Sequence, residues 1–247
     1  MDRMLYIAMS GAKETMMSQA SLNNNLANAS TTGFVADLNQ FRSMPVYGEG
    51  QPTRVYALSE SPSPDFKPGA FTVTGRDLDV AVSTGGWFAV QAPDGTEAYT
   101  RRGDLQMDAN GLVTTSNGLP LMGDGGPIAI PPAEKISIGS DGTISIVPQG
   151  GDPTELAVID RIKMVAPQFE DMQKGKDGLM RLKSGEDSPA DATQRLIQGA
   201  LEGSNVNTVA EMTRMIELQR RFEMQVKMMK TADKMADSAA SLLRPGG

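Results

Sequence analysis

The sequence predicts an α+β protein whose N- and C-terminal helices form a coiled-coil-like core, with an extended connector and an antiparallel β domain between them. Near both chain ends, apolar residues recur at alternating steps of three and four, which indicates helices that pack on other helices. From Gly75 to about Arg181 the period changes to two, with Gly-containing turn pairs between the apolar runs. We expect four parts: an N-terminal helix and loop at 1–43, the connector at 44–74, the β domain at 75–185, and a return segment with the C-terminal helix at 186–247.

The composition removes several kinds of chemistry. The 247 residues include no Cys and no His, which excludes thiol catalysis, disulfides, imidazole bases and most transition-metal sites. A net charge of −7 argues against nucleic acid or an anionic membrane as partner. No apolar run reaches the roughly 18 residues of a membrane span, so no membrane insertion is expected. The first residues lack the apolar stretch typical of a cleaved secretory signal.

Residues 3–28 are expected to form the first helix. Its apolar stripe is weak, because two of its seven positions are polar: Leu5, Met9, Ala12, Met16, Gln19, Asn23 and Leu26. Such a helix is marginal in water by itself, and Gly11 costs about 1 kcal/mol of helix propensity relative to Ala. Two interpretations stay open, an intramolecular pair of terminal helices or contact with other subunits. The second is favoured by the methionines, since flexible Met side chains suit repeated contacts with non-identical neighbours.

An Asn-rich stretch from Asn23 to Phe34 is expected to end this helix, because Asn and Ser side chains bond their own backbone and Gly33 permits a positive φ. The following stretch, 44–74, carries five prolines and three glycines. Proline excludes helix here and leaves edge strands or extended chain, with a strand or loose hairpin possible from Tyr47 to Leu58.

The β domain is expected to consist of short strands joined by tight turns at Asp94-Gly95, Asn110-Gly111, Asn117-Gly118 and Asp141-Gly142. Its aromatic core is small, with these expected anchors: Phe71, Trp87, Phe88 and Tyr99.

Three charged motifs in this region have residue types found in catalytic or ligand sites. Asp77 and Asp79 are two apart, as paired carboxylates can be, but a solvated strand face beside Arg76 explains them better. Arg101–Asp104 is expected to be the charged flank of a hairpin. Asp108–Gly111 has the start of a calcium loop but lacks its later bidentate Glu. We therefore expect no enzyme, no metal, no cofactor and no small-molecule substrate.

The last long element is a helix from Val206 to Leu243, preceded by a polar turn from Gln198 to Asn207. Thr208 and Glu211 fit a capping box at its start. Its seam is nearly regular: Met215, Leu218, Phe222, Met229, Ala232, Ala236, Ala239 and Leu243. At 1.5 Å per residue the helix would be roughly 55 Å long, so it needs a partner of comparable length.

Several motifs in this sequence together resemble those of the bacterial flagellar rod and hook proteins, the axial protein family. They lie at both ends and in the middle of the chain: Asn24-Asn25-Leu26-Ala27-Asn28, Thr32-Gly33-Phe34, Gly75–Val82, Gly86-Trp87-Phe88, Tyr99–Gly103, and Leu201-Glu202-x-Ser204-Asn205-Val206. One departure is Trp87, where Phe or Tyr is more usual. The start of the chain, with Tyr6 and Met9, and its modest length are most similar to proximal-rod members.

The resemblance implies a structural subunit that polymerises through its terminal helices into the hollow rod of the flagellar basal body. That rod is a drive shaft that transmits motor torque to the hook and filament. The alternatives are a distal-rod member of the same family or a periplasmic β-rich binding module. The implied partners are copies of itself, other rod proteins and the flagellar type III export apparatus, with no nucleic acid. The implied location is the rod, which spans the periplasm, reached without a cleaved signal peptide.

The resemblance also implies which residues form the assembly interface. At the N-terminal end these are Leu5, Met9, Ala12, Met16, Asn24, Asn25, Leu26, Ala27, Asn28, Thr32, Gly33 and Phe34. At the C-terminal end they are Leu201, Glu202, Ser204, Asn205, Val206, Met215, Leu218, Phe222, Met229, Ala236 and Leu243.

Overall fold

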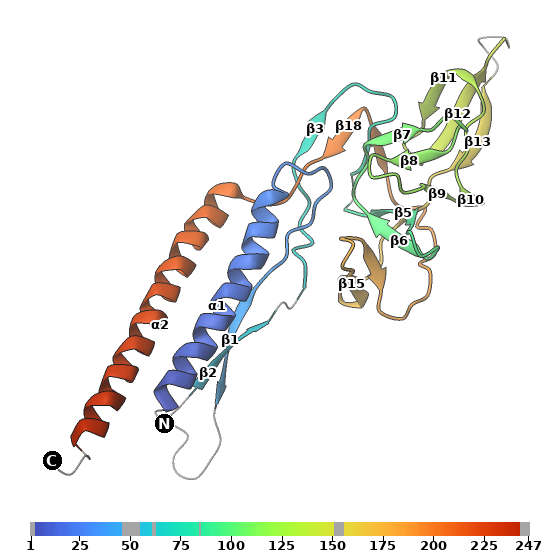
Figure 1. The fold of residues 1–247 in the computed structure, drawn as a ribbon. Coiled ribbons are helices and arrows are strands. Elements are labelled where there is room, and N and C mark those ends of the chain that lie inside the picture. Colours follow the sequence, from blue (N-terminus) through green and yellow to red (C-terminus); the bar gives the residue numbers. More distant parts are fainter. Residues whose placement is uncertain (1–2, 46–54, 61–62, 84, 151–155, 243–247) are drawn as a thin grey trace. The chain divides into compact units, whose positions relative to one another are not determined.

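A computed structural model describes residues 3–45, 55–60, 63–83, 85–150 and 156–242. The chain is α+β, with a helix near each end and antiparallel sheets between them, as predicted (Figure 1). It divides into two compact units. The helical unit comprises Met1–Ala29, Asp37–Pro64 and Val206–Gly247, and the β unit comprises Ser30–Ala36 and Asp65–Asn205. The expected connector at 44–74 is thus shared between the units.

The helical unit contains α1 (Arg3–Ala27), α2 (Thr208–Leu242) and a hairpin of β1 (Gln40–Pro45) and β2 (Val55–Glu60). The two helices lie side by side and antiparallel, so that α1 begins at the end of the pair where α2 ends (Figure 1). The hairpin is antiparallel from Gln40 opposite Glu60 to Pro45 opposite Val55, and β2 packs on α1. No helix in the described part of the chain is long and apolar enough to cross a membrane.

The buried face of α1 differs from the predicted stripe. Leu5, Met9 and Met16 are exposed, whereas the buried residues lie mostly one position earlier: Ala8, Gly11, Ala12, Thr15, Ser18, Leu22 and Asn25. This corrects the predicted phase of the stripe by one residue, or about 100° around the helix. The physical reason is size, because small side chains let α2 approach closely. A Cβ at Gly11 would stand 2.8 Å from the Gln225 side-chain nitrogen of α2.

On α2 the less exposed face follows the predicted heptad positions. Leu218 and Ala232 are buried, and the residues between and before them are half-buried: Glu211, Met215, Phe222, Gln225 and Met229. Beyond Ala232 every described side chain of α2 up to Ser241 is exposed. The last part of the helix is therefore left uncovered by the described residues of its own chain.

The start of α2 corrects the expected capping box. The helix is capped by Asn207, whose side-chain oxygen accepts the N–H of Ala210 at 3.1 Å. Asn207 also supplies the first backbone acceptor of the helix, for the N–H of Glu211 at 3.0 Å. Thr208 is already the first helical residue, so the cap lies one position before the predicted one.

The β unit holds short antiparallel strands that form several small sheets. A five-stranded sheet has the order β14-β5-β6-β16-β15, and a three-stranded sheet has the order β11-β12-β13. The five-stranded sheet uses β14 (Met164–Val165), β5 (Trp87–Gln91), β6 (Glu97–Thr100), β16 (Met180–Leu182) and β15 (Met172–Lys174), and the three-stranded sheet uses β11 (Ala133–Ile138), β12 (Thr143–Pro148) and β13 (Ala157–Arg161). A single-turn helix, η1 (Phe169–Asp171), precedes β15.

The remaining strands form four ribbons of two strands each. They pair β17 (Leu196–Gln198) with β4 (Val80–Val82), β18 (Ala200–Glu202) with β3 (Phe71–Val73), β7 (Leu105–Met107) with β8 (Val113–Thr115), and β10 (Gly126–Pro127) with β9 (Met122–Gly123). Two of these strands, β17 and β18, lie where the sequence indicated a return segment and a polar turn. They bring the residues before α2 back alongside the start of the β unit.

The β unit has an apolar core made of two clusters of buried residues. Trp87, Phe88 and Tyr99 are buried as predicted, but Phe71 is 42% exposed, because β3 is paired only through β18 at the surface. The predicted turn at Asn110-Gly111 is present, with Gly111 at a φ of 84° and its Cα packed so close to Ile130 that a Cβ would meet the carbonyl oxygen at 2.2 Å.

Candidate functional site

Large apolar side chains that remain exposed gather on the helical unit. On α1 they are Met4, Leu5, Tyr6, Met9, Met16 and Met17, and on α2 they are Val209, Met212, Ile216, Met224, Met228 and Met235. The hairpin adds Phe41, Met44, Val55 and Leu58. Large apolar side chains exposed in such number on one unit are typical of a surface that contacts other proteins. We call the exposed apolar residues of α1 and α2 named above the helix faces.

The implied interface residues of the helical unit fall into two groups. Leu5, Met9 and Met16 belong to the exposed face of α1, whereas Ala12 is buried in the chain itself. On α2, Leu218 is buried, Ala236 is exposed, and Met215, Phe222 and Met229 are half-buried on the side nearer α1. Leu243 lies outside the described residues.

The Asn-rich end of α1 is held by side-chain hydrogen bonds. Asn25 clamps the backbone of Asp37, since its amide nitrogen donates to the Asp37 carbonyl and its oxygen accepts the Asp37 N–H, both at 2.9 Å. The Asn28 side chain donates to the carbonyl of Asn24 at 2.9 Å and so closes the last turn. Leu26 is half-buried and Ala27 is exposed.

Within the β unit, the Thr32-Gly33-Phe34 motif meets the segment that precedes α2. The Gly33 N–H donates to the Glu202 carbonyl at 2.8 Å, and the Asn205 N–H donates to the Phe34 carbonyl at 3.4 Å. Gly33 is required here, because its φ is 64° and a Cβ would stand 2.4 Å from the Arg102 backbone nitrogen. The Thr32–Phe34 motif and the Leu201–Val206 motif, far apart in the sequence, thus lie against each other. We call this place the chain junction.

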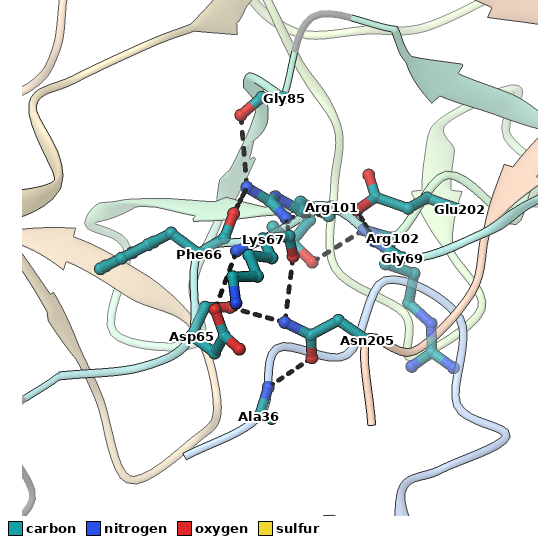
Figure 2. Close-up of polar contacts among 11 residues, drawn as sticks. Ala36, Asp65, Phe66, Lys67, Gly69, Gly85, Arg101, Arg102, Glu202 and Asn205 are labelled. Carbon is teal, nitrogen blue, oxygen red and sulfur yellow. Dashed lines mark hydrogen bonds and ion pairs between the residues drawn. The ribbon is translucent and has the colours of Figure 1, made fainter. Parts of the chain in front are cut away.

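Asn205 ties a third segment into the chain junction. Its side-chain oxygen accepts the N–H of Ala36 at 2.8 Å, and its amide nitrogen donates to the carbonyls of Asp65 at 2.6 Å and Lys67 at 3.0 Å (Figure 2). An Asn side chain offers both a donor and an acceptor, so it can bridge two passing backbones at once.

At the centre of the chain junction lies a buried ion pair between Arg101 and Glu202. Arg101 Nη1 is 3.2 Å from Glu202 Oε1, and both side chains are 2% exposed. The guanidinium also donates to the carbonyls of Phe66 at 2.8 Å, Lys67 at 3.1 Å and Gly85 at 3.4 Å (Figure 2). It lies over the Trp87 ring, 4.5 Å from the centroid. Glu202 Oε1 in turn accepts the Gly69 N–H at 2.9 Å.

Burial dominates the electrostatics of this pair. It raises the pKa of Glu202 and lowers the pKa of Arg101, and in each case the attraction of the partner offsets only part of the burial cost. Such a pair is worth little as a source of net stability, but removing one partner leaves an uncompensated charge in the interior. The pair therefore makes the segments at the chain junction depend on one another.

The sequence did not identify Arg101 as a junction residue. It was expected to flank a charged hairpin at the surface, and the structure instead buries it against Glu202 and Trp87. Its neighbour Arg102 fits the expectation better, with a pair to Asp104 at 3.0 Å near the surface. The one feature of the sequence that indicates a special role for Arg101 is its place within the Tyr99–Gly103 motif.

The remaining residues of the two chain-junction motifs lie in the β18–β3 ribbon or are half-buried. Leu201 pairs with Thr72 across the β18–β3 ribbon, and Thr32, Ser204 and Val206 are half-buried. Lys174 lies over the Phe34 ring at 4.6 Å and donates to the Val35 carbonyl at 2.9 Å.

The charged motifs considered for chemistry have structural roles. Asp77 is exposed, while Asp79 is 1% exposed and pairs with Arg76 at 3.5 Å, so the two do not share the solvated strand face expected for them. Asp108 accepts the backbone N–H groups of Asn110 and Leu112, both at 2.8 Å, which makes its loop a side-chain-stabilised turn.

An open groove of about 440 Å³ lies on the β unit between Gly75–Leu78 and Ala133–Ile136. No aromatic side chain lines it, and its four charged residues are two of each sign: Arg76, Asp77, Glu134 and Lys135. Among the described residues there is no group of three or more acidic side chains placed to hold a metal ion. The helix faces and the chain junction are therefore the features that bear on function.

Comparison with known families gives two matches along the chain. Residues 81–146 match a family described as flagellar hook protein FlgE/F/G D1 domain. Residues 197–242 match a family described as flagellar basal body rod FlgEFG protein C-terminal. The second match begins in β17 and contains Glu202, Asn205 and all of α2.

Relatives match over almost the whole chain. The chain is 44% identical to the flagellar basal-body rod protein FlgF of Escherichia coli over 249 positions, covering 98% of this chain and 99% of the relative. It is 43% identical to FlgF of Salmonella typhimurium over the same shares of the two chains. It is 32% identical to the rod protein FlgG of Bacillus subtilis, covering 99% of this chain and 100% of the relative.

Proposed function

Because this chain belongs to the family of flagellar basal-body rod proteins, we propose that it enters the rod by packing its helix faces against other copies and other rod subunits. As a family member it is a structural protein of the flagellar basal body. The assembled subunits would form a hollow shaft that transmits motor torque to the hook and filament.

The single observation that carries this proposal is the place of the exposed apolar residues. Most of them lie in the helical unit, along both helices, and eight on α1 and α2 are more than half exposed: Met9, Met16, Met17, Val209, Met212, Ile216, Met224 and Met235. Burying a Met, Leu or Ile side chain stabilises an interface by roughly 1.5–3 kcal/mol. Contacts along both helices are therefore strong enough to drive assembly.

The helix pair of one chain also leaves a seam that another chain can use. The heptad positions of α2 continue through Ala236 and Ala239, beyond the last buried residue, Ala232. We infer that the two terminal helices pair in a coiled-coil manner and that helices of neighbouring subunits complete the packing. Because each helix is marginal alone, both would be disordered in the free subunit and would order in the rod.

Identity is 44% and 43% to FlgF of Escherichia coli and Salmonella typhimurium but 32% to FlgG of Bacillus subtilis, which supports a place in the proximal rod rather than the distal rod. The chain would leave the cell through the flagellar type III export apparatus and reside in the rod across the periplasm. It would act without catalysis.

The test is a strain that lacks the gene, with basal bodies purified and imaged by electron microscopy. The proposal predicts rods that stop short, no hook and no swimming, with all three restored by the intact gene. The length of the stunted rod tells a proximal position from a distal one. Complete rods and normal swimming in the deleted strain would overturn the proposal.

A further inference from the structure

We propose that the exposed methionines of α1 and α2 are a modification site for two-electron oxidants, and that sulfoxide formation there keeps the subunit out of the rod. The inference rests on the proposed function, because it assumes that the helix faces are the contact surface. It adds that the oxidation state of the methionine sulfurs on that surface decides whether the subunit can assemble.

Except for Met107, which is 44% exposed, and Met122, which is half-buried, the methionines of the β unit are far less exposed than those of the helix faces. On the helices, Met9 is 54% exposed, Met16 58% and Met235 59%. In the β unit, Met164, Met172 and Met180 are 2–3% exposed and lie within its apolar core. An oxidant in solution therefore reaches the helix methionines first.

No other side chain competes strongly for the oxidant. The chain has no Cys, which would otherwise react first through its thiolate. Its only Trp, Trp87, is 1% exposed and covered by Arg101. The most accessible reducing groups of the subunit are consequently the thioethers on the surfaces that assembly needs.

The reaction is a simple oxygen-atom transfer. With hypochlorous acid, the thioether sulfur gives up two electrons and gains an S–O bond, while the chlorine is reduced and leaves as chloride with a proton. The product is methionine sulfoxide, which methionine sulfoxide reductases return to the thioether.

Sulfoxide formation changes the helix faces without breaking the chain. It converts a flexible apolar side chain into a polar one and so disrupts Met-rich contacts. A buried sulfoxide oxygen costs free energy unless a hydrogen-bond donor reaches it, whereas the thioether it replaces needs none. Once the subunit is in the rod, the same sulfurs are covered by neighbours and are protected.

The first experiment maps oxidation residue by residue. The purified full-length chain and isolated basal bodies are each exposed to hypochlorous acid, and sulfoxides are located by peptide mass spectrometry. In the free chain, the methionines of the helix faces should gain oxygen severalfold faster than Met164, Met172 and Met180. In basal bodies the helix methionines should be protected. Equal rates in the two units, or equal rates before and after assembly, would overturn the inference.

The second experiment tests the consequence in cells that lack methionine sulfoxide reductases. Rod protein synthesis is induced during a brief sublethal pulse of hypochlorous acid, and rods are counted by electron microscopy. A variant with Leu at the helix-face positions (Met9→Leu, Met16→Leu, Met212→Leu, Met224→Leu and Met235→Leu) should assemble through the pulse while the natural chain does not. Met107→Leu, at an exposed methionine of the β unit, should give no protection.

The controls keep failure of the inference apart from failure of the proposed function. Ile216→Glu places a charge on the α2 face without any oxidation, and its loss of assembly tests the contact surface alone. If Ile216→Glu fails to assemble but oxidised and unoxidised chains assemble equally, the inference is wrong and the proposed function stands. If the variant with five Leu substitutions fails to assemble even without oxidant, the oxidation rates measured by mass spectrometry in the free chain and in basal bodies decide whether the inference holds.

Discussion

At the scale of single residues, the chain junction depends on polar groups that only partners far away in sequence can satisfy. Arg101 and Glu202 are 101 positions apart and are both almost fully buried. Glu202 and Asn205 could be singled out in advance through their motif, but no local pattern predicts that Arg101 leaves the surface to meet them. Long-range pairing of charges is decided by the fold, and neither composition nor periodicity reports it.

The cost of breaking this pair is a first prediction. Arg101→Ala leaves the Glu202 carboxylate buried without its cation and should destabilise the β unit by about 3–5 kcal/mol. Arg181→Ala is the matched control, since its pair with Asp177 at 2.7 Å is more exposed and should be worth at most about 1 kcal/mol. Denaturant unfolding followed by the fluorescence of Trp87 measures both. Equal effects of the two substitutions would contradict the role given to Arg101.

A second prediction concerns pH. The Tyr99 hydroxyl accepts the N–H of Ser188 at 2.6 Å, and burial raises the pKa of Tyr99 well above its usual value of 10. A raised pKa in the folded state means that this contribution to stability is full below the unfolded-state pKa of about 10 and is lost as the pH rises beyond it. At neutral pH, Tyr99→Phe should be less stable by about 1–3 kcal/mol, because the buried Ser188 N–H loses its acceptor.

The pH test compares the free energy of unfolding of the two chains at neutral pH and at several values above about 10. The natural chain should lose stability more steeply with rising pH than Tyr99→Phe, so the gap between them should narrow. Parallel curves would show that Tyr99 ionises as readily in the folded chain as in the unfolded one.

At the scale of elements, the existence of both terminal helices could be predicted, but the rotation of α1 could not. Hydrophobicity favours the stripe with Met9 and Met16, whereas the structure buries Ala8, Gly11 and Thr15. What decides the rotation is the space available between α1, α2 and the hairpin, and small residues fit there. The large methionines are left outside, where they are available to other subunits.

The start of α2 supplies a third prediction. Asn207→Ala removes the acceptor for the Ala210 N–H and should destabilise the helix by about 1 kcal/mol, in the range of 0.5–2. Thr208→Ala, the matched control, should change it little, because Thr208 is the first helical residue and Ala is a good helix former. Amide hydrogen exchange in the first turn of α2, measured in isolated basal bodies where the helix is ordered, gives the difference. A larger effect of Thr208→Ala would restore the capping box as the correct interpretation.

The β elements illustrate what turn chemistry can and cannot predict. Asn110-Gly111 and Asp141-Gly142 place glycines where a positive φ is needed, and the structure has both turns. The strands β17 and β18 escaped prediction because each is three residues long and pairs with strands more than 100 positions earlier. Such short strands carry too little local pattern to be recognised.

At the scale of the whole molecule, the two units differ in how much apolar surface they leave exposed. The β unit buries most of its large apolar residues in its own core, whereas the helical unit leaves many of its own exposed along α1 and α2. The family could be predicted from motifs spread along the chain, and the relatives confirm it over 98% of the sequence. How neighbouring copies meet depends on the other subunits as well as on this chain.

The central claim is that the helices carry assembly while the β unit folds without them. The most direct measurement is electron microscopy of basal bodies from cells whose only copy of the chain ends at Asn207, with the purified truncated chain checked for the unfolding transition of its β unit. The account predicts a β unit that still unfolds cooperatively, because the chain junction is complete by Asn205, together with rods that stop short. Complete rods built from the truncated chain would contradict the claim.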